Sequence, residues 1–201
     1  TCKYLVLRFA MNQVGQDYAI TRLQKLRLVL LFIRNNSRIR SLSTWQQHLL
    51  LAEELFRVPK SLEGDVVECG CYAGASTANL SLACHLVGRR LFVCDSFKGL
   101  PKPREDEKYT TVRDYNAYYY WQEGEFSTEG GLAQVKENVS RFGKIEVCKF
   151  EEGYYRDTLK VMDNDSFVLI FEDADLVSSV QDCLKHLWPK LQEGCIFYCH
   201  E

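Results

Sequence analysis

An acid and two closely spaced glycines occur together between Glu68 and Ser76, where the chain reads E-C-G-C-Y-A-G-A-S. Gly70 permits a tight turn and a close approach of the backbone to a ligand. Gly74 opens a stretch of helical composition, and the N–H groups at the start of a helix favour a carboxylate. Together with the acid, this turn is typical of a binding site for a small charged ligand.

A second acid, Asp95, lies 25 residues after Gly70, at the end of the next apolar run. In open α/β sheets, ligands bind outside the carboxyl ends of the strands, and an acid there accepts the ribose hydroxyls of a nucleoside. The alternative is that the glycines serve only tight packing. Cys71-Tyr72 occupies the place where a dinucleotide motif needs its second glycine. Glu68 suits an ammonium group, which favours S-adenosylmethionine (SAM) over the pyrophosphate of NAD.

Further acids follow the later apolar runs, with Asp173 and Asp175 after one run and His200 and Glu201 after the last. The ends of neighbouring strands lie side by side, so these groups should converge beside the nucleoside site. Carboxylates suit Mg²⁺, and a histidine shifts the preference towards Mn²⁺, Fe²⁺ or Zn²⁺. The alternative is that they are solvated strand ends. The other histidines, expected on helices as surface or packing residues, are His48, His85 and His186.

The elements that must position these groups follow from apolar periodicity. Strands alternating with helices imply right-handed crossovers and a parallel sheet buried on both faces. The expected fold class is therefore α/β, with a Rossmann-like parallel sheet. The expected strands cover residues 65–69, 91–94, 145–150, 167–171 and 196–199, and the expected helices cover 75–86, 132–142 and 177–191.

Residues 1–62 are expected to form a helical extension, and residues 63–201 the SAM-binding domain. Thr44 and Gln47 have capping-box spacing before a helix that ends near Pro59, and another helix is expected over 18–34. These helices are candidates for a homo-oligomer contact. Their basic residues could contact phosphate or anionic lipid, although a solvated helix face is the favoured interpretation. The basic residues are Arg22, Lys25, Arg27, Arg34, Arg38 and Arg40.

Residues 101–131 interrupt the alternation with a polar and aromatic insert. A connection of this length is usually functional or disordered, and its aromatic content argues against disorder. Two interpretations stay open, a packed surface flap and a lid over a pocket. The aromatic residues are Tyr109, Tyr115, Tyr118, Tyr119, Tyr120, Trp121 and Phe126.

The charge and the cysteine content of the chain limit its possible binding partners and its cellular compartment. The formal net charge of −2 over 201 residues gives no global attraction for nucleic acid or a membrane. The longest apolar run of the basic region, Leu28 to Ile33, is too short to span a bilayer, and no signal peptide is visible. Nine cysteines without a metal-type spacing indicate thiols in a reduced compartment, so we expect a cytoplasmic protein.

From Gly64 to Glu201 the sequence resembles the macrocin O-methyltransferase family (TylF/MycF type). The resemblance is carried by the stretches GDVVECGCYAGAST, CDSFKGLPKP, EEGYYRDTL and EDADL. It implies a class I methyltransferase that moves a methyl group from SAM to a hydroxyl of a sugar or another polyol-containing small molecule. It also implies a divalent metal, usually Mg²⁺, that binds the acceptor oxygens.

The resemblance also implies roles for individual residues. Asp95 would bind the ribose, Asp173 would be a metal ligand, and Asp173 or Asp175 would remove the acceptor proton. His200 and Glu201 stand where the family usually has two aspartates, so with Asp173 they would form a metal site that favours Mn²⁺ over Mg²⁺. The methionine part of SAM would contact Glu68, Gly70, Tyr72, Gly74 and Ser76, and the adenine would lie near Ser96, Phe97, Glu152 and Gly153.

Some features depart from the family pattern. Val177 replaces a usual tyrosine, Lys98 replaces a usual acid, and the chain stops before the usual antiparallel pair of C-terminal strands. Two other functions therefore stay open. One is a SAM-binding module without turnover, and the other is an NAD-linked oxidoreductase.

Overall fold

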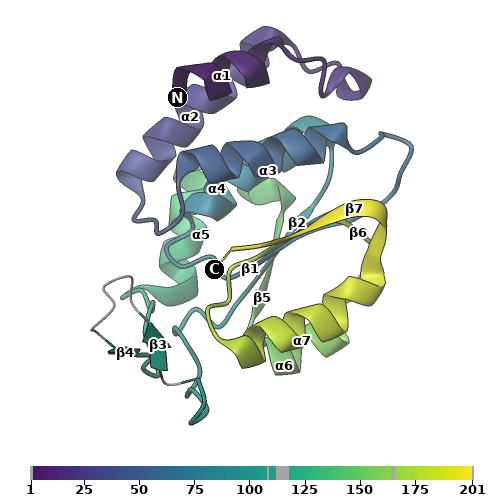
Figure 1. The fold of residues 1–201 in the computed structure, drawn as a ribbon. Coiled ribbons are helices and arrows are strands. Elements are labelled where there is room, and N and C mark those ends of the chain that lie inside the picture. Colours follow the sequence, from purple (N-terminus) through teal and green to yellow (C-terminus); the bar gives the residue numbers. More distant parts are fainter. Residues whose placement is uncertain (1, 108, 112–117, 164–165, 201) are drawn as a thin grey trace.

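The computed structural model describes residues 2–107, 109–111, 118–163 and 166–200 (Figure 1). Its centre is a sheet of five strands in the order β5-β2-β1-β6-β7, and every neighbouring pair is parallel. This confirms the expected α/β class. The strands are β1 (Asp65–Cys69), β2 (Leu91–Asp95), β5 (Cys148–Glu152), β6 (Phe167–Glu172) and β7 (Leu191–Cys199).

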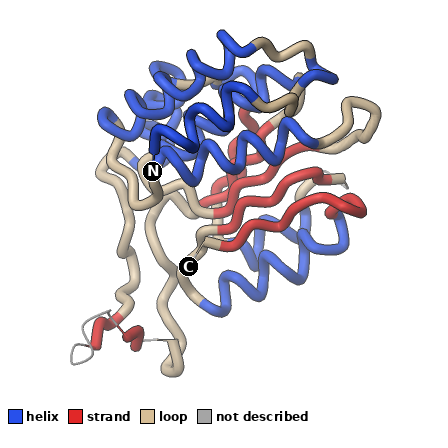
Figure 2. Tube along the Cα trace, turned by 45° about the horizontal axis from the view of Figure 1, so that its top comes forward, coloured by secondary structure: helices blue, strands red, loops and turns tan. Residues whose placement is uncertain are grey.

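Helices cover both faces of the sheet (Figure 2). On one face α3 (Trp45–Arg57), α4 (Ala75–Val87) and α5 (Gly131–Phe142) bury their apolar residues in a core shared with β1 and β2. On the other face α6 (Tyr155–Thr158) and α7 (Val177–Leu187) pack over a smaller core. The central strands are therefore buried on both sides, as a parallel sheet requires.

Two further helices, α1 (Cys2–Met11) and α2 (Arg22–Arg38), form an outer layer over α3 (Figure 1). A short 3₁₀ turn, η1 (Gln16–Tyr18), lies between them. Phe9 of α1 and Phe32 of α2 are fully buried in the same core as the sheet. The outer layer is thus packed onto the fold, while the division at residue 62 stays a prediction.

The starts of α2 and α3 follow local sequence signals. Thr44 and Gln47 form the expected capping box at α3, with the Thr44 N–H donating to Gln47 Oε1 at 2.7 Å. Thr21 and Gln24 form a second capping box, so α2 begins four residues later than expected and runs to Arg38.

Other boundaries differ because local turns intervene. Residues 145–147 form a 3₁₀ turn, η2 (Ile145–Val147), before β5 begins. Helix α7 ends at Leu187 because Pro189 starts the 3₁₀ turn η4 (Trp188–Lys190), and β7 follows directly. A further 3₁₀ turn, η3 (Leu159–Val161), follows α6.

The insert forms an antiparallel pair, β3 (Tyr109–Thr111) with β4 (Tyr118–Tyr120). Tyr115, counted among its expected aromatics, lies outside the described residues. Glu107 connects the insert to the start of α7, where its carboxylate accepts the Ser178 N–H and hydroxyl at 2.5 and 3.1 Å. A carboxylate is favoured at the N-terminal end of a helix because the backbone N–H groups there have no partners within the helix.

No helix among the described residues has the length and apolar character needed to cross a bilayer. The nine cysteines, all described, are free thiols. The first finding agrees with the expectation that no segment of this sequence spans a membrane.

Candidate functional site

A cavity of about 530 Å³ opens at the carboxyl ends of the central strands. It is where parallel strands and the following helix N-termini leave room for a ligand. Most of the residues expected at the site share this cavity. Those that line it are Gly70, Tyr72, Ser76, Asp95, Ser96, Gly153, Asp173, Asp175 and His200.

Four expected cofactor residues lie outside the cavity lining. Glu68 is buried directly behind it, and Gly74 is packed close to Val135 of α5. The Phe97 ring packs near Phe150, 6.3 Å between centroids. Glu152 is half exposed. Its carboxylate lies 3.6 Å from Lys98 Nζ, so it contacts a residue that departs from the family pattern.

Glu68 is a buried acid with an unused oxygen. Its side chain is 0% exposed, and the Thr77 hydroxyl donates to Oε2 at 2.6 Å. Oε1 finds no hydrogen-bond partner among the described residues. Burial and, to a smaller extent, the charges of Asp95 and Asp173 raise the pKa of Glu68, while the Ser76 and Thr77 hydroxyls lower it, and the result is a pKa of about 8. A buried acceptor without a donor fits a ligand that brings an ammonium group.

Gly70 allows the ends of β1 and β6 to approach each other. Its φ is +90°, and a Cβ at this position would lie 1.9 Å from the Asp173 carbonyl oxygen. Only glycine fits such a contact. The same contact places the backbone of Asp173 beside the turn, which brings the two predicted halves of the site together.

Asp95 is held by backbone donors at the end of β2. Its Oδ2 accepts the Cys71 N–H at 2.8 Å, and its Oδ1 accepts the Phe97 N–H at 2.7 Å. Each carboxylate oxygen keeps a second lone pair, because a carboxylate has about four acceptor sites. Asp95 is therefore oriented by the turn of β1 and still able to accept ligand hydroxyls at the cavity.

Strained backbone conformations gather around this cavity. Tyr72, Phe126 and Asp175 have φ values of 46°, 62° and 61°, and all three residues line the cavity. Such conformations persist where the surroundings enforce them, and they cluster at ligand sites. The rings of Tyr72 and Phe126 meet edge to face at 6.1 Å, and Phe126 also contacts Trp121 at 5.8 Å. The described end of the insert thus forms one wall of the cavity.

Asp173 and His200 form a pair at the ends of β6 and β7. His200 Nδ1 lies 3.0 Å from Asp173 Oδ1, and both side chains are about a quarter exposed. Burial raises the pKa of Asp173, and the neighbouring His200 partly offsets this. His200 Nδ1 and Asp173 Oδ1 therefore form a hydrogen bond with each other.

Asp173 and His200 are two of the three residues expected to bind a metal ion. Glu201, its third ligand, lies outside the described residues. No group of three or more His, Cys, Asp or Glu side chains placed to hold an ion occurs in the described part of the chain. Asp173 and His200 alone do not fit a divalent metal site, so metal binding stays a prediction.

The sequence-based reasoning missed a wall of the cavity formed by residues 40–43, between α2 and α3. Arg40 stacks over the Tyr72 ring, 5.6 Å from its centroid. No local pattern marks these residues as functional. Only the path of the chain across α4 brings them to the turn of β1.

A buried polar network holds this wall in place. His48, which is 0% exposed, contacts Ser43 Oγ through Nε2 at 2.7 Å and Asn79 Nδ2 through Nδ1 at 2.8 Å. The Asn79 amide also donates to Asn36 Oδ1 at 3.0 Å, and the Asn35 amide donates to Asn79 Oδ1 at 2.9 Å. Burial lowers the pKa of His48 to about 3, so the ring is neutral at pH 7. His48 is a packing residue, as expected, and it connects α2, α3 and α4 behind the cavity.

Comparisons with known proteins show what the chain is similar to. The profile of the family described as macrocin-O-methyltransferase (TylF) matches residues 49–199. The chain is 28% identical over 150 residues to mycinamicin III 3''-O-methyltransferase of Micromonospora griseorubida, covering 69% of this chain and 58% of that protein. It is 30% identical over 135 residues to the 8-demethyl-8-(2,3-dimethoxy-alpha-L-rhamnosyl)-tetracenomycin-C 4'-O-methyltransferase of Streptomyces olivaceus, covering 65% of this chain and 50% of that protein. The chain thus spans about half the length of these curated relatives.

Solved structures show the same fold. The O-methyltransferase NovP matches with a TM-score of 0.70 at 20% identity, covering 85% of this chain and 81% of NovP. The calicheamicin methyltransferase CalS11 matches with a TM-score of 0.61 at 19% identity, covering 96% of this chain and 73% of CalS11.

Proposed function

The chain belongs to the macrocin O-methyltransferase (TylF) family, and from this premise we propose that it transfers a methyl group from SAM to a hydroxyl of a sugar or another polyol-containing small molecule. The observation that carries the proposal is the pair of acids at the β1 and β2 ends. Glu68 has an unused buried oxygen, and Asp95 is held facing the cavity by backbone donors. One of the relatives described above is named as the 4'-O-methyltransferase of a rhamnosyl-tetracenomycin, and the other as the 3''-O-methyltransferase of mycinamicin III.

The cofactor would be held by the turn between β1 and α4. Glu68 would accept the ammonium group, the free N–H groups at the start of α4 would bind the carboxylate, and Asp95 would accept the ribose hydroxyls. Ser96 and Gly153 lie on the same side of the cavity and would border the adenine. When bound, SAM supplies an electrophilic methyl group on its sulfonium.

The remaining residues of the cavity would serve the acceptor. Methyl transfer is an in-line displacement, so the protein's main task is to align the acceptor oxygen. Asp173 and His200 line the cavity at the ends of β6 and β7 and would take up the hydroxyl proton, shared over their 3.0 Å contact. Trp121 and Phe126 would help to exclude water from this space, and closure of the insert over it stays a prediction.

The test combines binding and turnover. Isothermal titration calorimetry should detect S-adenosylhomocysteine (SAH), and the methyl group of labelled SAM should appear on a deoxysugar-bearing acceptor. Asp173→Asn should bind SAH as wild type does and lose most of the transfer. Stabilisation by NAD with no binding of SAH would overturn the proposal. Binding without transfer to any polyol acceptor would assign the chain to the class of SAM-binding modules without turnover.

Metal assistance by Asp173, His200 and Glu201 is a separate prediction. Mn²⁺ and Mg²⁺ should be titrated calorimetrically into wild type and into Asp173→Asn. Saturable binding that is stronger for Mn²⁺ and lost in the variant would support the site. Equal heats in the two proteins would remove the metal from the proposal and leave the proton to Asp173 and His200.

A further inference from the structure

The outer face of the N-terminal helices exposes an unusual number of apolar side chains. On α2, Leu23, Leu26, Leu30 and Ile33 follow a helical spacing and are 75%, 42%, 68% and 40% exposed. The described residues include thirteen exposed large hydrophobic side chains, and α1 and α2 carry seven of them. The apolar side chains therefore form a concentrated surface and not the scatter that soluble proteins normally show. The other three, all on α1, are Tyr4, Leu7 and Met11.

The same two helices are strongly basic. They contain seven Lys or Arg and no Asp or Glu, although the whole chain has a net charge of −2. Arg27, Arg34 and Arg38 lie at i, i+7 and i+11, in a row along one side of the apolar stripe, because each residue advances an α-helix by 100°. Arg22 lies on the other side of the stripe. The face is thus an apolar stripe bordered by cations.

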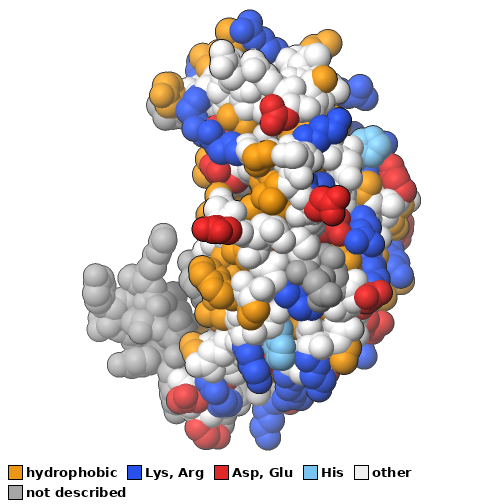
Figure 3. All heavy atoms as spheres, turned by 90° about the vertical axis from the view of Figure 1, so that its right-hand side faces the viewer, with side chains coloured by type: hydrophobic (Ala, Val, Ile, Leu, Met, Phe, Trp, Pro, Cys, Tyr) orange, Lys and Arg blue, Asp and Glu red, His pale blue; other side chains and the backbone are white. Residues whose placement is uncertain are grey.

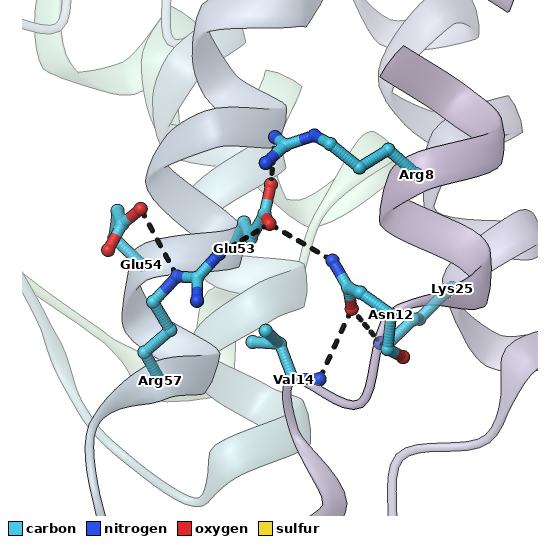
Figure 4. A network of polar contacts seen from close by, with 7 residues as sticks. All are labelled: Arg8, Asn12, Val14, Lys25, Glu53, Glu54 and Arg57. Carbon is cyan, nitrogen blue, oxygen red and sulfur yellow. Dashed lines mark hydrogen bonds and ion pairs between the residues drawn. The ribbon is translucent and has the colours of Figure 1, made fainter. Parts of the chain in front are cut away.

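This face is presented by a firmly docked layer (Figure 4). Behind it, Glu53 of α3 accepts from Arg8 at 2.5 Å, from Arg57 at 2.7 Å and from Asn12 at 3.0 Å. Lys25 turns inwards and donates to Asn12 Oδ1 at 2.7 Å. Phe9 of α1 and Phe32 of α2 are also fully buried in the core. The inner faces of both helices are therefore packed onto the fold, and the exposed stripe is a second face that points away from the core.

We propose that the outer face of α1 and α2 docks on an anionic membrane surface. An amphipathic helix with leucines on one side and arginines beside them lies in the plane of the bilayer interface. The leucines would enter the boundary between headgroups and acyl chains, while the arginines would reach lipid phosphates with their long side chains. Figure 3 shows Lys and Arg beside hydrophobic side chains at the end of the molecule formed by these helices.

The charges decide between this partner and a second copy of the chain. A twofold interface places the same patch of both subunits in contact, so the arginine rows would face each other without any acid of α1 or α2 between them. Like charges in such a contact repel. An anionic lipid surface pairs the cations with lipid phosphates and also buries the apolar stripe. A nucleic acid would satisfy the cations and leave the leucines in water.

Sedimentation with vesicles tests the proposal. The protein should pellet with vesicles of phosphatidylcholine mixed with phosphatidylglycerol, pellet much less with phosphatidylcholine alone, and be released by salt. Arg27→Gln combined with Arg38→Gln should weaken binding to the mixed vesicles by about tenfold or more, since each cation near an anionic surface adds to affinity. Leu23→Ser combined with Leu30→Ser should weaken it comparably.

Matched controls come from α7 on the opposite side of the sheet. Leu184→Ser and Lys185→Gln change an exposed leucine and a lysine there and should leave vesicle binding as it is in wild type. All variants should bind SAH equally, which shows that they are folded and separates this proposal from the proposed function. Equal pelleting with neutral and mixed vesicles, or equal losses in the α7 controls, would overturn it. So would a dimer in sedimentation equilibrium that the Leu23→Ser/Leu30→Ser variant abolishes, because a second copy would then cover the face.

Discussion

Two buried glutamates, Glu53 in the helical layer and Glu68 in the sheet, have opposite surroundings. Glu53 is 1% exposed and both of its oxygens accept, from Arg8, Asn12 and Arg57. Glu68 is 0% exposed, has no cation beside it and leaves Oε1 without a partner in the described structure. Both carboxyls are taken out of water, which is costly unless the group is paired.

This difference in hydrogen-bond partners distinguishes an acid with a structural role, Glu53, from an acid that can bind a ligand, Glu68. Around Glu53 the protein supplies all the donors, so the group's role is complete when the chain is folded. Around Glu68 the protein supplies the hydroxyls of Ser76 and Thr77 and two further acids nearby, and the carboxyl holds its proton up to about pH 8. Folding stability spent in this way is typical of functional sites. The predictions below test this distinction, from the largest effect to the smallest.

Glu53→Ala should lower the free energy of unfolding by about 2–4 kcal/mol, because three donors lose their acceptor in a partly buried network. The effect should stay below that of a fully buried pair, since the two arginines are 38% and 47% exposed and can turn to water. Urea denaturation measures it. The control is Glu54→Ala, which removes an exposed carboxylate that lies 3.3 Å from Arg57 and should cost about 0.5 kcal/mol or less. Equal losses in both variants would contradict a structural role special to Glu53.

Glu68→Gln should weaken SAH binding by about 10- to 100-fold, the 1.5–3 kcal/mol typical of a hydrogen bond to a charged group. The free energy of unfolding should not fall at pH 7, because the amide replaces a buried group whose raised pKa already costs stability at this pH. Asp65→Asn is the matched control. It alters the acid at the opposite end of β1, which pairs with Arg90 at 2.7 Å, and calorimetry should show wild-type affinity. Unchanged affinity in Glu68→Gln would remove this residue from the cofactor site.

The pH dependence of stability should also report Glu68. Its pKa is about 8 in the folded protein and 4.5 ordinarily, so between these values the folded state binds more protons than the unfolded state. Stability must then fall as pH rises through this window, by up to about 1.4 kcal/mol from pH 6 to pH 7. Urea denaturation at both pH values should show a smaller fall, or a rise, in Glu68→Gln. Identical slopes in the two proteins would show that the carboxyl is ionised in the folded state.

Ser43→Ala should have the smallest effect, about 1 kcal/mol of stability, because His48 Nε2 loses its partner behind the cavity. Ser37→Ala removes a hydroxyl that bonds only locally, to the Arg34 carbonyl oxygen, and should cost less than half as much by thermal denaturation. The Ser43 variant should also raise KM for the acceptor more than it lowers kcat. A pure loss of kcat would indicate that the wall formed by residues 40–43 acts on the reaction and not on acceptor binding.

Much of the scaffold follows from short stretches of sequence. The apolar runs before Gly70 and Asp95 predict β1 and β2 because a parallel sheet buries both faces of its strands. The Thr44–Gln47 box predicts the start of α3, because its hydrogen bonds join residues three apart. The acids at the strand ends also predict that Asp95 and Asp173 lie in the region of the site, since parallel strands end at one edge of the sheet.

The tertiary structure alone decided which side chains meet. Glu53 finds Arg8 45 positions away, Asn35 finds Asn79 44 positions away, and residues 40–43 reach the cavity by crossing α4. It also decided that Asp173 pairs with His200, and that α2 buries Phe32 while it exposes a second apolar side at Leu23 and Leu30. Helical periodicity and capping depend on neighbours along the chain, so the local sequence predicts them. The pairing of distant polar groups depends on how whole helices pack, so no local sequence pattern predicts it.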